Sequence, residues 1–403
     1  MYLRQFPAEF NQALSILQQI EANGYEAYFV GGSVRDFLLK RPIADVDIAT
    51  SAFPAEIKQI FPRTIDTGIK HGTVTVMQDH TPYEVTTFRT ESGYQDFRRP
   101  DHVTFVRSLR ADLQRRDFTI NALAVRADGL VIDEFSGLQD LKQHLIRAVG
   151  DPEARFHEDA LRMMRAVRLS GQLAFQIDPE TYQSLEEHAP LLAKIAVERI
   201  HNELIKLMLS NHWQVGWLIF VKSGLIRHTP FFDQLGSDLP LFDQMPTVPL
   251  PDEAAVWALL GLKLKLSPQT LRQLLQAWKT SNNVTHACVQ TLACGQLLRS
   301  QQTLTANQLY QVDLTVIDRL QKIWLNLGWQ ANFAQLKRDY QALPIKNRQQ
   351  LQLNGRVLMQ NLDLHPSPLL GTILNEAEQA VVQGQVENSQ KALLNWTKKR
   401  LQS

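Results

Sequence analysis

Two short stretches decide the fold of the first part of this chain: Val30–Asp36, which reads Val-Gly-Gly-Ser-Val-Arg-Asp, and 44–48, which reads Ala-Asp-Val-Asp-Ile. The glycine pair lies between an apolar strand pattern that ends at Val30 and a helical pattern that begins at Val34. Backbone N–H groups at such a helix N-terminus are well placed to bind phosphate oxygens. The first stretch therefore predicts a strand–turn–helix unit that holds a phosphate.

The second stretch is predicted to include a second strand to which Asp45-Val46-Asp47 belongs, so that the two carboxylates, two residues apart, point to one face. Two carboxylates beside a phosphate cradle match two-metal phosphoryl or nucleotidyl transfer, in which the metals lie roughly 4 Å apart. By itself a Gly-Gly pair is usually a turn, and an Asp-x-Asp is usually solvated or capping. In strand–turn–helix–strand order the two motifs together favour nucleotidyl transfer.

The composition is that of a soluble globular protein, with 44% hydrophobic and 21% charged residues. A chain of 403 residues is too long for one ordinary core, so two to four modules are expected. The net charge of +1 gives no indication of a nucleic-acid partner, although a local basic stripe remains compatible with it. The two cysteines lack metal-site spacing and are expected to be buried thiols. No apolar run approaches the ~20 residues of a membrane span and no signal core is seen, which predicts a cytoplasmic protein without a membrane partner.

The hydrophobic patterns predict an α+β fold: a head with a mixed sheet and flanking helices up to residue 150, then an all-helical remainder, with no strand expected from residue 156 onward. The expected helices of the head are 7–23, 34–40 and 54–61, and the expected strands are 26–30, 46–50, 72–78 and 83–88. Residues 79–82 are expected to close a hairpin, and 103–106 and 145–149 to form a last strand pair. Residues 89–101 lack periodicity and are expected to form a long functional loop.

Two further polar features in the head have both a functional and a plainer interpretation. Arg115 and Arg116, beside Asp117 and Asn121, could clamp a triphosphate and hydrogen-bond a ribose, or could be an exposed helix start with local charge pairs. Glu84 lies in a strand pattern, where it is either an outward-facing residue or a third carboxylate of the metal and base site.

A third polar cluster follows residue 156, and its charged residues are spaced three positions apart. Asp159, Arg162, Arg165 and Arg168 are expected on one helix, where they form a sloping stripe. Such a row is usually a solvated face, but a nucleotide site upstream needs side chains that read the base. Further on, 199 and 203 are occupied by Arg and Glu, an i,i+4 spacing that predicts a helix-stabilising pair.

These motifs, in this order, resemble the class II CCA-adding enzymes, the bacterial tRNA nucleotidyltransferases of the polymerase-β superfamily. The matching segments are Gly31–Asp36, Asp45 with Asp47, Arg115–Ala122, Gly150–Arg168 and Glu198–Glu203, and a fainter match follows at 362–371. The resemblance implies a polymerase-β-type nucleotidyltransferase head over 1–150. It further implies a helical neck for base recognition over 151–215, a helical body over 216–325 and a tRNA-binding tail over 326–403.

The resemblance also implies roles for individual residues. Asp45 and Asp47 would hold Mg²⁺ and act in catalysis, with Glu84 as a third catalytic carboxylate. The triphosphate and ribose would be bound by Gly31, Gly32, Ser33, Arg35, Arg116, Asp117 and Asn121. Asp159 and Arg162 would read the base, supported by Arg165 and Arg168. A carboxylate only accepts and a guanidinium only donates hydrogen bonds, so the pair suits cytosine and adenine and opposes guanine and uracil without a template.

The implied activity is addition of CCA to the 3′ end of tRNA from CTP and ATP. The partners are then tRNA and the two nucleotides, while the oligomeric state stays open and a homodimer is admitted. Basic residues of the last helices are candidates for tRNA phosphate contacts: Lys337, Arg338, Lys346, Arg348, Arg356, Lys391, Lys398, Lys399 and Arg400. The loop 89–101 is expected to move with the growing 3′ end and so switch the pocket from C to A.

Two alternatives remain open from the sequence. One is a poly(A) polymerase or a partial CC- or A-adding enzyme of the same superfamily, and the loop at 89–101 counts against a CC-only enzyme. The other is a catalytically inactive RNA-binding homologue, against which the presence of both Asp45 and Asp47 counts.

Overall fold

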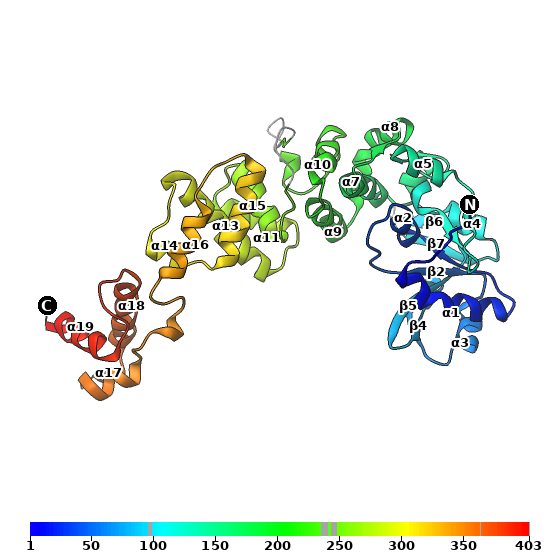
Figure 1. The fold of residues 1–403 in the computed structure, drawn as a ribbon. Helices are drawn as coiled ribbons and strands as arrows, with labels where there is room; N and C mark the ends of the chain where they lie inside the picture. Colours follow the sequence, from blue (N-terminus) through cyan, green and yellow to red (C-terminus); the bar gives the residue numbers. More distant parts are fainter. Residues whose placement is uncertain (96–98, 235–240, 243–247, 363, 403) are drawn as a thin grey trace. The chain divides into compact units, whose positions relative to one another are not determined.

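The computed structural model describes residues 1–95, 99–234, 241–242, 248–362 and 364–402 (Figure 1). The chain divides into two compact units, Met1–Asp243 and Gln244–Ser403, which are treated separately below. Among the described residues, every strand lies in the first unit, and the second unit is helical. The predicted α+β class is therefore confirmed, whereas the finer division at residues 150, 215 and 325 stays a prediction.

A seven-stranded mixed sheet forms the centre of the head, with the order β3-β4-β5-β2-β1-β8-β9. Its strands are β1 Ala27–Val30, β2 Asp47–Thr50, β3 Thr64–Gly68, β4 Thr73–Gln78, β5 Thr81–Thr87, β8 Leu123–Val125 and β9 Val131–Asp133. Strand β2 pairs with β5 in parallel, and the other neighbours are antiparallel. The expected hairpin of β4 and β5 is confirmed.

Both faces of this sheet are covered, which explains the continuous apolar run of β1. Alternate side chains of a strand point to opposite faces. Phe29 stacks on Phe10 of helix α1 (Ala8–Ala22), with ring centroids 4.3 Å apart. Its neighbours Tyr28 and Val30 belong to a second buried cluster on the other face, which also includes Leu113 of helix α4 (Leu109–Gln114). Truncating either phenylalanine to alanine is expected to cost about 3–5 kcal/mol of stability.

The turn after β1 leads into helix α2 (Gly32–Leu38), and helices α3 (Pro54–Ile60) and α5 (Gly137–Gln143) complete the head. The bounds of α1, α2 and α3 agree with the expected helices to within two residues, and α2 begins directly at the second glycine of the motif. The strand–turn–helix unit read from the sequence is thus confirmed.

The prediction of a loop over 89–101 is wrong for its described residues. Strands β6 (Arg89–Gln95) and β7 (Arg99–Phe105) form a two-stranded antiparallel sheet, while residues 96–98 lie outside the described part. Backbone pairing holds this hairpin outside the main sheet, so its sequence shows no alternation of apolar and polar residues.

The expected strand pair of 103–106 with 145–149 is also wrong. Val103 pairs with Glu91 across the hairpin. Strand β10 (Leu145–Ile146) runs parallel to β11 (Gln176–Ile177), which also corrects the expectation that no strand follows residue 156. Strands of two residues are too short to carry a recognisable period.

In the described part of the first unit, five helices follow the sheet: α6 (Pro152–Glu158), α7 (Leu161–Leu173), α8 (Pro179–His188), α9 (Val197–Met208) and α10 (Trp213–Lys222). Helix α7 packs against α9 and α10. A Cβ atom at Gly216 of α10 would lie 2.5 Å from the carbonyl oxygen of Val167, so this close crossing requires glycine.

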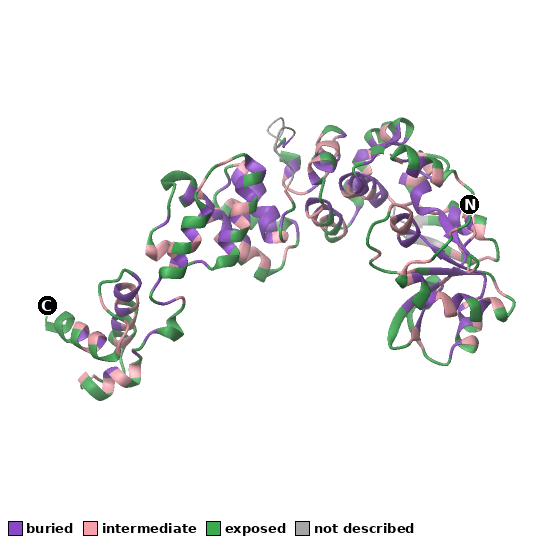
Figure 2. Ribbon diagram, in the orientation of Figure 1, coloured by how far each residue is buried: buried purple, intermediate pink, exposed green. Residues whose placement is uncertain are grey.

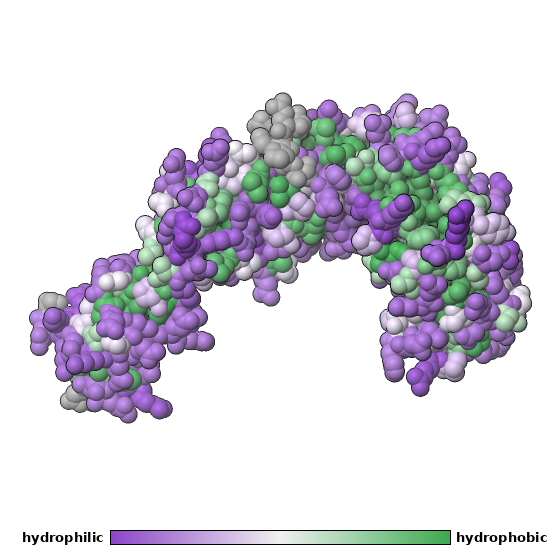
Figure 3. All heavy atoms as spheres, in the orientation of Figure 1, coloured by the Kyte–Doolittle hydropathy of each residue, from purple (hydrophilic) through white to green (hydrophobic). Residues whose placement is uncertain are grey.

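The second unit consists of packed helices around buried tryptophans and leucines (Figure 2). Its helices are α11 Glu253–Lys263, α12 Pro268–Ala277, α13 Asn282–Gln301, α14 Ala306–Tyr310, α15 Leu314–Leu327, α16 Phe333–Ala342, α17 Gly355–Leu362, α18 Pro368–Val382 and α19 Gln390–Gln402. Cys288 and Cys294 are buried free thiols, as expected. Within the described residues no helix has the length and apolar character needed to cross a bilayer. On the face drawn in Figure 3, hydrophilic side chains predominate over the last helices.

Candidate active site

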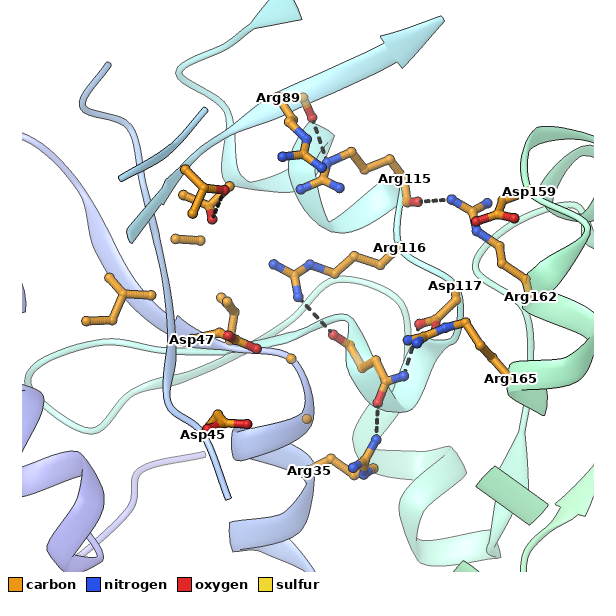
Figure 4. Close-up of a pocket in the computed structure, with 18 of the residues that line it drawn as sticks. Arg35, Asp45, Asp47, Arg89, Arg115, Arg116, Asp117, Asp159, Arg162 and Arg165 are labelled. Carbon is orange, nitrogen blue, oxygen red and sulfur yellow. Dashed lines mark hydrogen bonds and ion pairs between the residues drawn. The ribbon is translucent and has the colours of Figure 1, made fainter. Parts of the chain in front are cut away.

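The first unit contains a cavity of about 750 Å³, into which most of the polar motifs of the sequence converge (Figure 4). Its charged lining consists of eight cationic side chains (Arg35, Arg89, Arg115, Arg116, Arg162, Arg165, Arg168 and Lys206) and four carboxylates (Asp45, Asp47, Asp117 and Asp159). Gly31, Gly32, Thr73, Thr86 and Asn121 also line it, together with apolar residues of β1 and β2. This excess of positive charge suits a polyanionic ligand.

The glycine turn brings backbone close to the charged residues. Gly31 has φ 74°, a left-handed conformation that glycine adopts without strain. A Cβ atom here would lie 3.2 Å from Nη1 of Arg116 and 3.5 Å from Oδ2 of Asp47. The absence of a side chain therefore leaves room for both charged groups beside the turn.

Asp45 and Asp47 lie together on one side of the cavity (Figure 4). Strand β2 begins at Asp47, so the prediction that both residues lie on the strand is wrong for Asp45, which precedes it. The pKa of Asp47 is raised, chiefly because burial removes its carboxylate from water. The negative charges of Glu84 and Asp45 raise this pKa further, and the positive charge of Arg116 lowers it. Carboxylate oxygens are the ligands that hard divalent cations prefer, and such a cation would relieve the mutual repulsion. The donor set therefore fits a metal of this type.

Glu84 lies beside Asp45 and Asp47, but it is not among the described residues that line the 750 Å³ cavity. It is the parallel-register partner of Asp47 on β5 and is exposed. A second cavity of about 570 Å³ is lined by Glu84, Asp45 and Asp47 together. The geometry thus brings the three predicted carboxylates close together, with Glu84 on a different side of the pair from the arginines.

Ser33 was predicted to bind the nucleotide, but its side chain forms a hydrogen bond within the protein. Its buried hydroxyl donates to the carbonyl oxygen of Val30 over 2.9 Å, and among the described residues it does not line the cavity. It therefore fastens the turn between β1 and α2, and only its backbone is left for a ligand.

A chain of hydrogen bonds crosses the back of the cavity from Arg35 to Arg165. Arg35 Nη1 donates to Oδ1 of Asn121 over 2.6 Å, and Nδ2 of Asn121 donates to Oδ1 of Asp117 over 3.0 Å. Arg165 Nη2 lies 2.6 Å from Oδ2 of Asp117. Burial by itself would raise the pKa of Asp117, but Arg165, the Asn121 amide and Arg162 together hold that pKa far below its usual range. Asp117 is therefore ionised and orients the groups around it.

The two adjacent arginines share one buried carboxylate. Oδ1 of Asp112 on α4 lies 2.6 Å from Nη2 of Arg115, and its Oδ2 lies 3.2 Å from Nη2 of Arg116. Arg116 also keeps a buried Nε without a partner in the described residues. Arg115 and Arg116 are thus held in the wall of the cavity by Asp112 and do not form an exposed helix start.

The helix expected to carry Asp159 and the arginine row is broken at Asp159. Helix α6 ends at Glu158, Asp159 has extended backbone angles, and α7 begins at Leu161. Oδ1 of Asp159 accepts the backbone N–H of Leu161 over 3.0 Å, so a local side-chain contact replaces the continuing helical bond. Arg162, Arg165 and Arg168 lie on α7, and all four side chains line the cavity.

Each base-reading candidate has its own partner. Asp159 binds Nη2 of Arg199 on α9 over 3.1 Å. Arg162 Nη1 lies 2.5 Å from Oε2 of Glu158, and its Nη2 donates to the carbonyl oxygen of Arg115 over 2.8 Å. The two candidates are thus presented separately, each held by an opposite charge.

Comparison with known proteins agrees with these motifs. Residues 27–147 match the family model of the poly A polymerase head domain, and residues 174–235 match a probable RNA- and SrmB-binding site of polymerase A. Residues 248–397 match a putative domain 2 of tRNA nucleotidyltransferases. The CCA-adding enzyme of Latilactobacillus sakei is 52% identical over 406 residues, which cover 99% of this chain and 100% of that protein. The chain belongs to the family of CCA-adding enzymes.

Two further relatives of this CCA-adding family extend over nearly the whole chain. The CCA-adding enzyme of Limosilactobacillus reuteri is 49% identical over 394 residues, or 98% of both chains. The crystal structure of the Bacillus stearothermophilus CCA-adding enzyme in complex with CTP is 38% identical, with a TM-score of 0.89 and coverage of 98% of both chains. Membership makes this chain a nucleotidyltransferase, as the motifs predicted, and implies the use of a divalent metal.

Some charged residues that hold the site in place were not predicted from the sequence. The prediction that Arg199 and Glu203 pair with each other is wrong, because Arg199 binds Asp159 and Glu203 binds Nε of Arg168 over 2.5 Å. Asp112 and Glu158 were also missed. For these two a signal existed: each precedes an arginine of the cavity by three or four residues, the spacing at which helical side chains meet.

Proposed function

We propose that this protein adds cytidine, cytidine and adenosine in turn to the 3′ end of tRNA, using CTP and ATP and releasing pyrophosphate, without a nucleic-acid template. The observation that carries the proposal is the arrangement of the 750 Å³ cavity. Asp45 and Asp47 lie at one side of it and Asp159 and Arg162 at the other, with arginines between them (Figure 4). A nucleoside triphosphate placed across it would have its phosphates near the carboxylate pair and its base near Asp159.

In this proposal the carboxylate pair holds Mg²⁺. A Mg²⁺ ion bound by Asp45 and Asp47 would supply a Lewis acid for the 3′ oxygen of tRNA and for the phosphate oxygens. Arg116 lies beside Asp47 and the glycine turn, where its guanidinium can bind the triphosphate as a planar donor. Arg35 and Asn121 are joined by a hydrogen bond of 2.6 Å and would position the ribose. Glu84, next to Asp47 in register, is assigned to the deprotonation of the 3′ hydroxyl.

Base selection falls to Asp159 and Arg162. Cytosine and adenine each present an amino donor next to a ring-nitrogen acceptor, which complements an accepting carboxylate and a donating guanidinium. Guanine and uracil present the opposite order and would leave buried charged groups unpaired. Arg199 and Glu158 hold the two readers in place before a nucleotide arrives. Arg165 and Arg168 are each fixed by a carboxylate, Asp117 and Glu203.

The basic residues of the last helices are assigned to the phosphates of tRNA. Several of them are paired within their own unit: Lys337 with Asp318 over 2.6 Å, and Arg400 with Glu376 over 3.1 Å. Exposed pairs of this kind contribute little stability, so RNA phosphates can replace the carboxylates. We place the reaction in the cytoplasm, where the tRNA substrate is made and used.

The test is nucleotide incorporation on a tRNA that ends at its discriminator base, with Mg²⁺ and each nucleoside triphosphate in turn. CTP alone should add two residues, ATP alone should add none, and CTP with ATP should add CCA and then stop. Repeated addition from ATP alone would point to a poly(A) polymerase instead. Arrest after CC in the presence of ATP would point to a partial enzyme, and binding of tRNA without any incorporation to an inactive homologue.

A further inference from the structure

A second group of metal-ligating side chains lies between helices α6 and α8. Glu153 and His157 are one turn apart on α6, and His188 ends α8. One ligand atom from each of the three residues lies within 4.8 Å of the other two. Oε1 of Glu153 is 3.9 Å from Nε2 of His188, and the two imidazole rings meet edge to face with centroids 4.7 Å apart. The described residues that line the active-site cavity do not include these three.

Backbone carbonyl groups determine which ring nitrogen of each histidine can bind a metal. Nδ1 of His188 lies 2.8 Å from the carbonyl oxygen of Ser184, and Nδ1 of His157 lies 3.1 Å from that of Glu153. A carbonyl oxygen can only accept, so each Nδ1 must carry the hydrogen. The lone pair of each ring is then on Nε2. Orientation of an imidazole by a carbonyl on its other nitrogen is the usual outer-shell arrangement of a metal-bound histidine.

The two helices hold these rings in place without a metal. Asp151 caps α6 by accepting from the N–H of Glu153 over 3.1 Å, and Asp178 caps α8 by accepting from the N–H of Thr181 over 3.3 Å. The helices pack against each other. By contrast, the side chain of Glu153 is 66% exposed, so its carboxylate can turn toward the rings at little cost. Because a hydrogen bond at Nδ1 orients each imidazole and the carboxylate of Glu153 is adjustable, the site needs little reorganisation on binding.

We propose that Glu153, His157 and His188 form a binding site for a transition-metal dication of the zinc type, with water completing the coordination. Two imidazole nitrogens and one carboxylate oxygen suit Zn²⁺, whereas Mg²⁺ prefers oxygen ligands alone. The site thus differs in metal preference from the all-carboxylate pair Asp45 and Asp47. A bound metal ties α6 to α8, and α6 ends at Glu158, the partner of Arg162. Occupancy therefore stabilises the segment that leads into the base-reading residues.

The experiment is a zinc titration of the full-length protein after treatment with a chelator, in competition with a chromophoric zinc indicator. Excess Mg²⁺ is present throughout so that the carboxylate pair does not compete. We expect one tight zinc site per chain, and a rise in the unfolding temperature when zinc is added, since a ligand that binds only the folded state stabilises it.

Two single variants and a matched control locate the site. His157→Gln and His188→Gln should each weaken the tightest zinc site by at least about tenfold, since loss of even an outer-shell partner costs that much. His286→Gln, which changes an exposed helical histidine of α13 in the other unit, should leave it unchanged. The unfolding temperature without zinc and incorporation with Mg²⁺ should be those of wild type in all three variants. Equal zinc affinity in wild type and His188→Gln, or an equal loss in His286→Gln, would overturn the proposal.

Discussion

The two sides of the active-site cavity differ in whether their carboxylates form ion pairs. On the carboxylate side, Asp45 and Asp47 form no ion pair within the described residues, and Asp47 lies near two like charges, Asp45 and Glu84, as well as near Arg116. On the opposite side, four carboxylates are paired with arginines: Asp117 with Arg165, Asp159 with Arg199, Glu158 with Arg162, and Glu203 with Arg168. Carboxylates without an ion pair suit an incoming cation, whereas paired groups are already oriented before a ligand binds. The Asp45 and Asp47 side therefore needs a bound cation to balance its charge, whereas the charged side chains on the other side are held in place before a ligand binds.

The sharpest way to test this contrast is to remove a carboxylate from the unpaired side. Asp47→Ala should lower incorporation more than about a hundredfold, since loss of a direct metal ligand exceeds the loss of an outer-shell partner. Affinity for tRNA, measured by filter binding, should stay within about twofold of wild type. The control is Asp66→Ala, which removes an exposed carboxylate of β3 that pairs with Lys58. Comparable activity of Asp47→Ala and Asp66→Ala would contradict the assigned role.

On the paired side the largest expected effect is on stability. Asp117→Asn leaves Arg165 without its carboxylate and should cost about 1–3 kcal/mol, measured by urea unfolding. Because the pKa of Asp117 is depressed in the folded state, its ionised form stabilises the fold above the unfolded pKa of about 4. This contribution is lost as the pH falls through the folded pKa. The stability difference between wild type and the variant should therefore be full at neutral pH and shrink below about pH 4; a difference that grows in acid would be inconsistent with this sign.

Changing a base reader should alter selectivity more than stability. Asp159→Asn removes a charge and adds an amide donor, so the pocket can then accept the carbonyl edge of uracil. We expect CTP use to fall about tenfold or more and UTP incorporation to become detectable, as measured by kcat/KM for each nucleotide. Unfolding by urea should change by less than about 1 kcal/mol, because Asp159 is only partly buried. Unchanged discrimination between CTP and UTP would remove Asp159 from base reading.

The smallest effect is expected for a positioning residue. Arg199→Lys keeps the positive charge near Asp159 but loses the two-pronged contact, with Nη1 3.4 Å and Nη2 3.1 Å from the carboxylate oxygens. KM for CTP should rise about threefold with kcat almost unchanged, and Arg199→Ala should have a larger effect of the same kind. A change in kcat alone would indicate that Arg199 acts on the reacting groups and not through Asp159.

Local patterns were enough to predict the elements that carry the site. The glycine pair, the Asp-x-Asp and the hairpin of β4 and β5 are each predicted from one short continuous segment of the chain, and all three are in the structure. The failures have the opposite character. Residues 89–101, which include β6 and the first part of β7, show no alternation of apolar and polar residues, and β10 and β11 are each two residues long, so neither pair of strands produces a periodic signal.

What the amino-acid sequence determined by itself is therefore the α+β class, the glycine turn between β1 and α2, the carboxylate pair and membership of a nucleotidyltransferase family. These depend on turn chemistry and hydrophobic period, which act over short distances. Only the tertiary structure decided which charges pair. Arg199 and Glu203 have an ideal helical spacing, yet they bind residues 40 and 35 positions away. A buried charge is stabilised by whichever opposite charge the fold brings within reach, and folding decides that distance, not position along the chain.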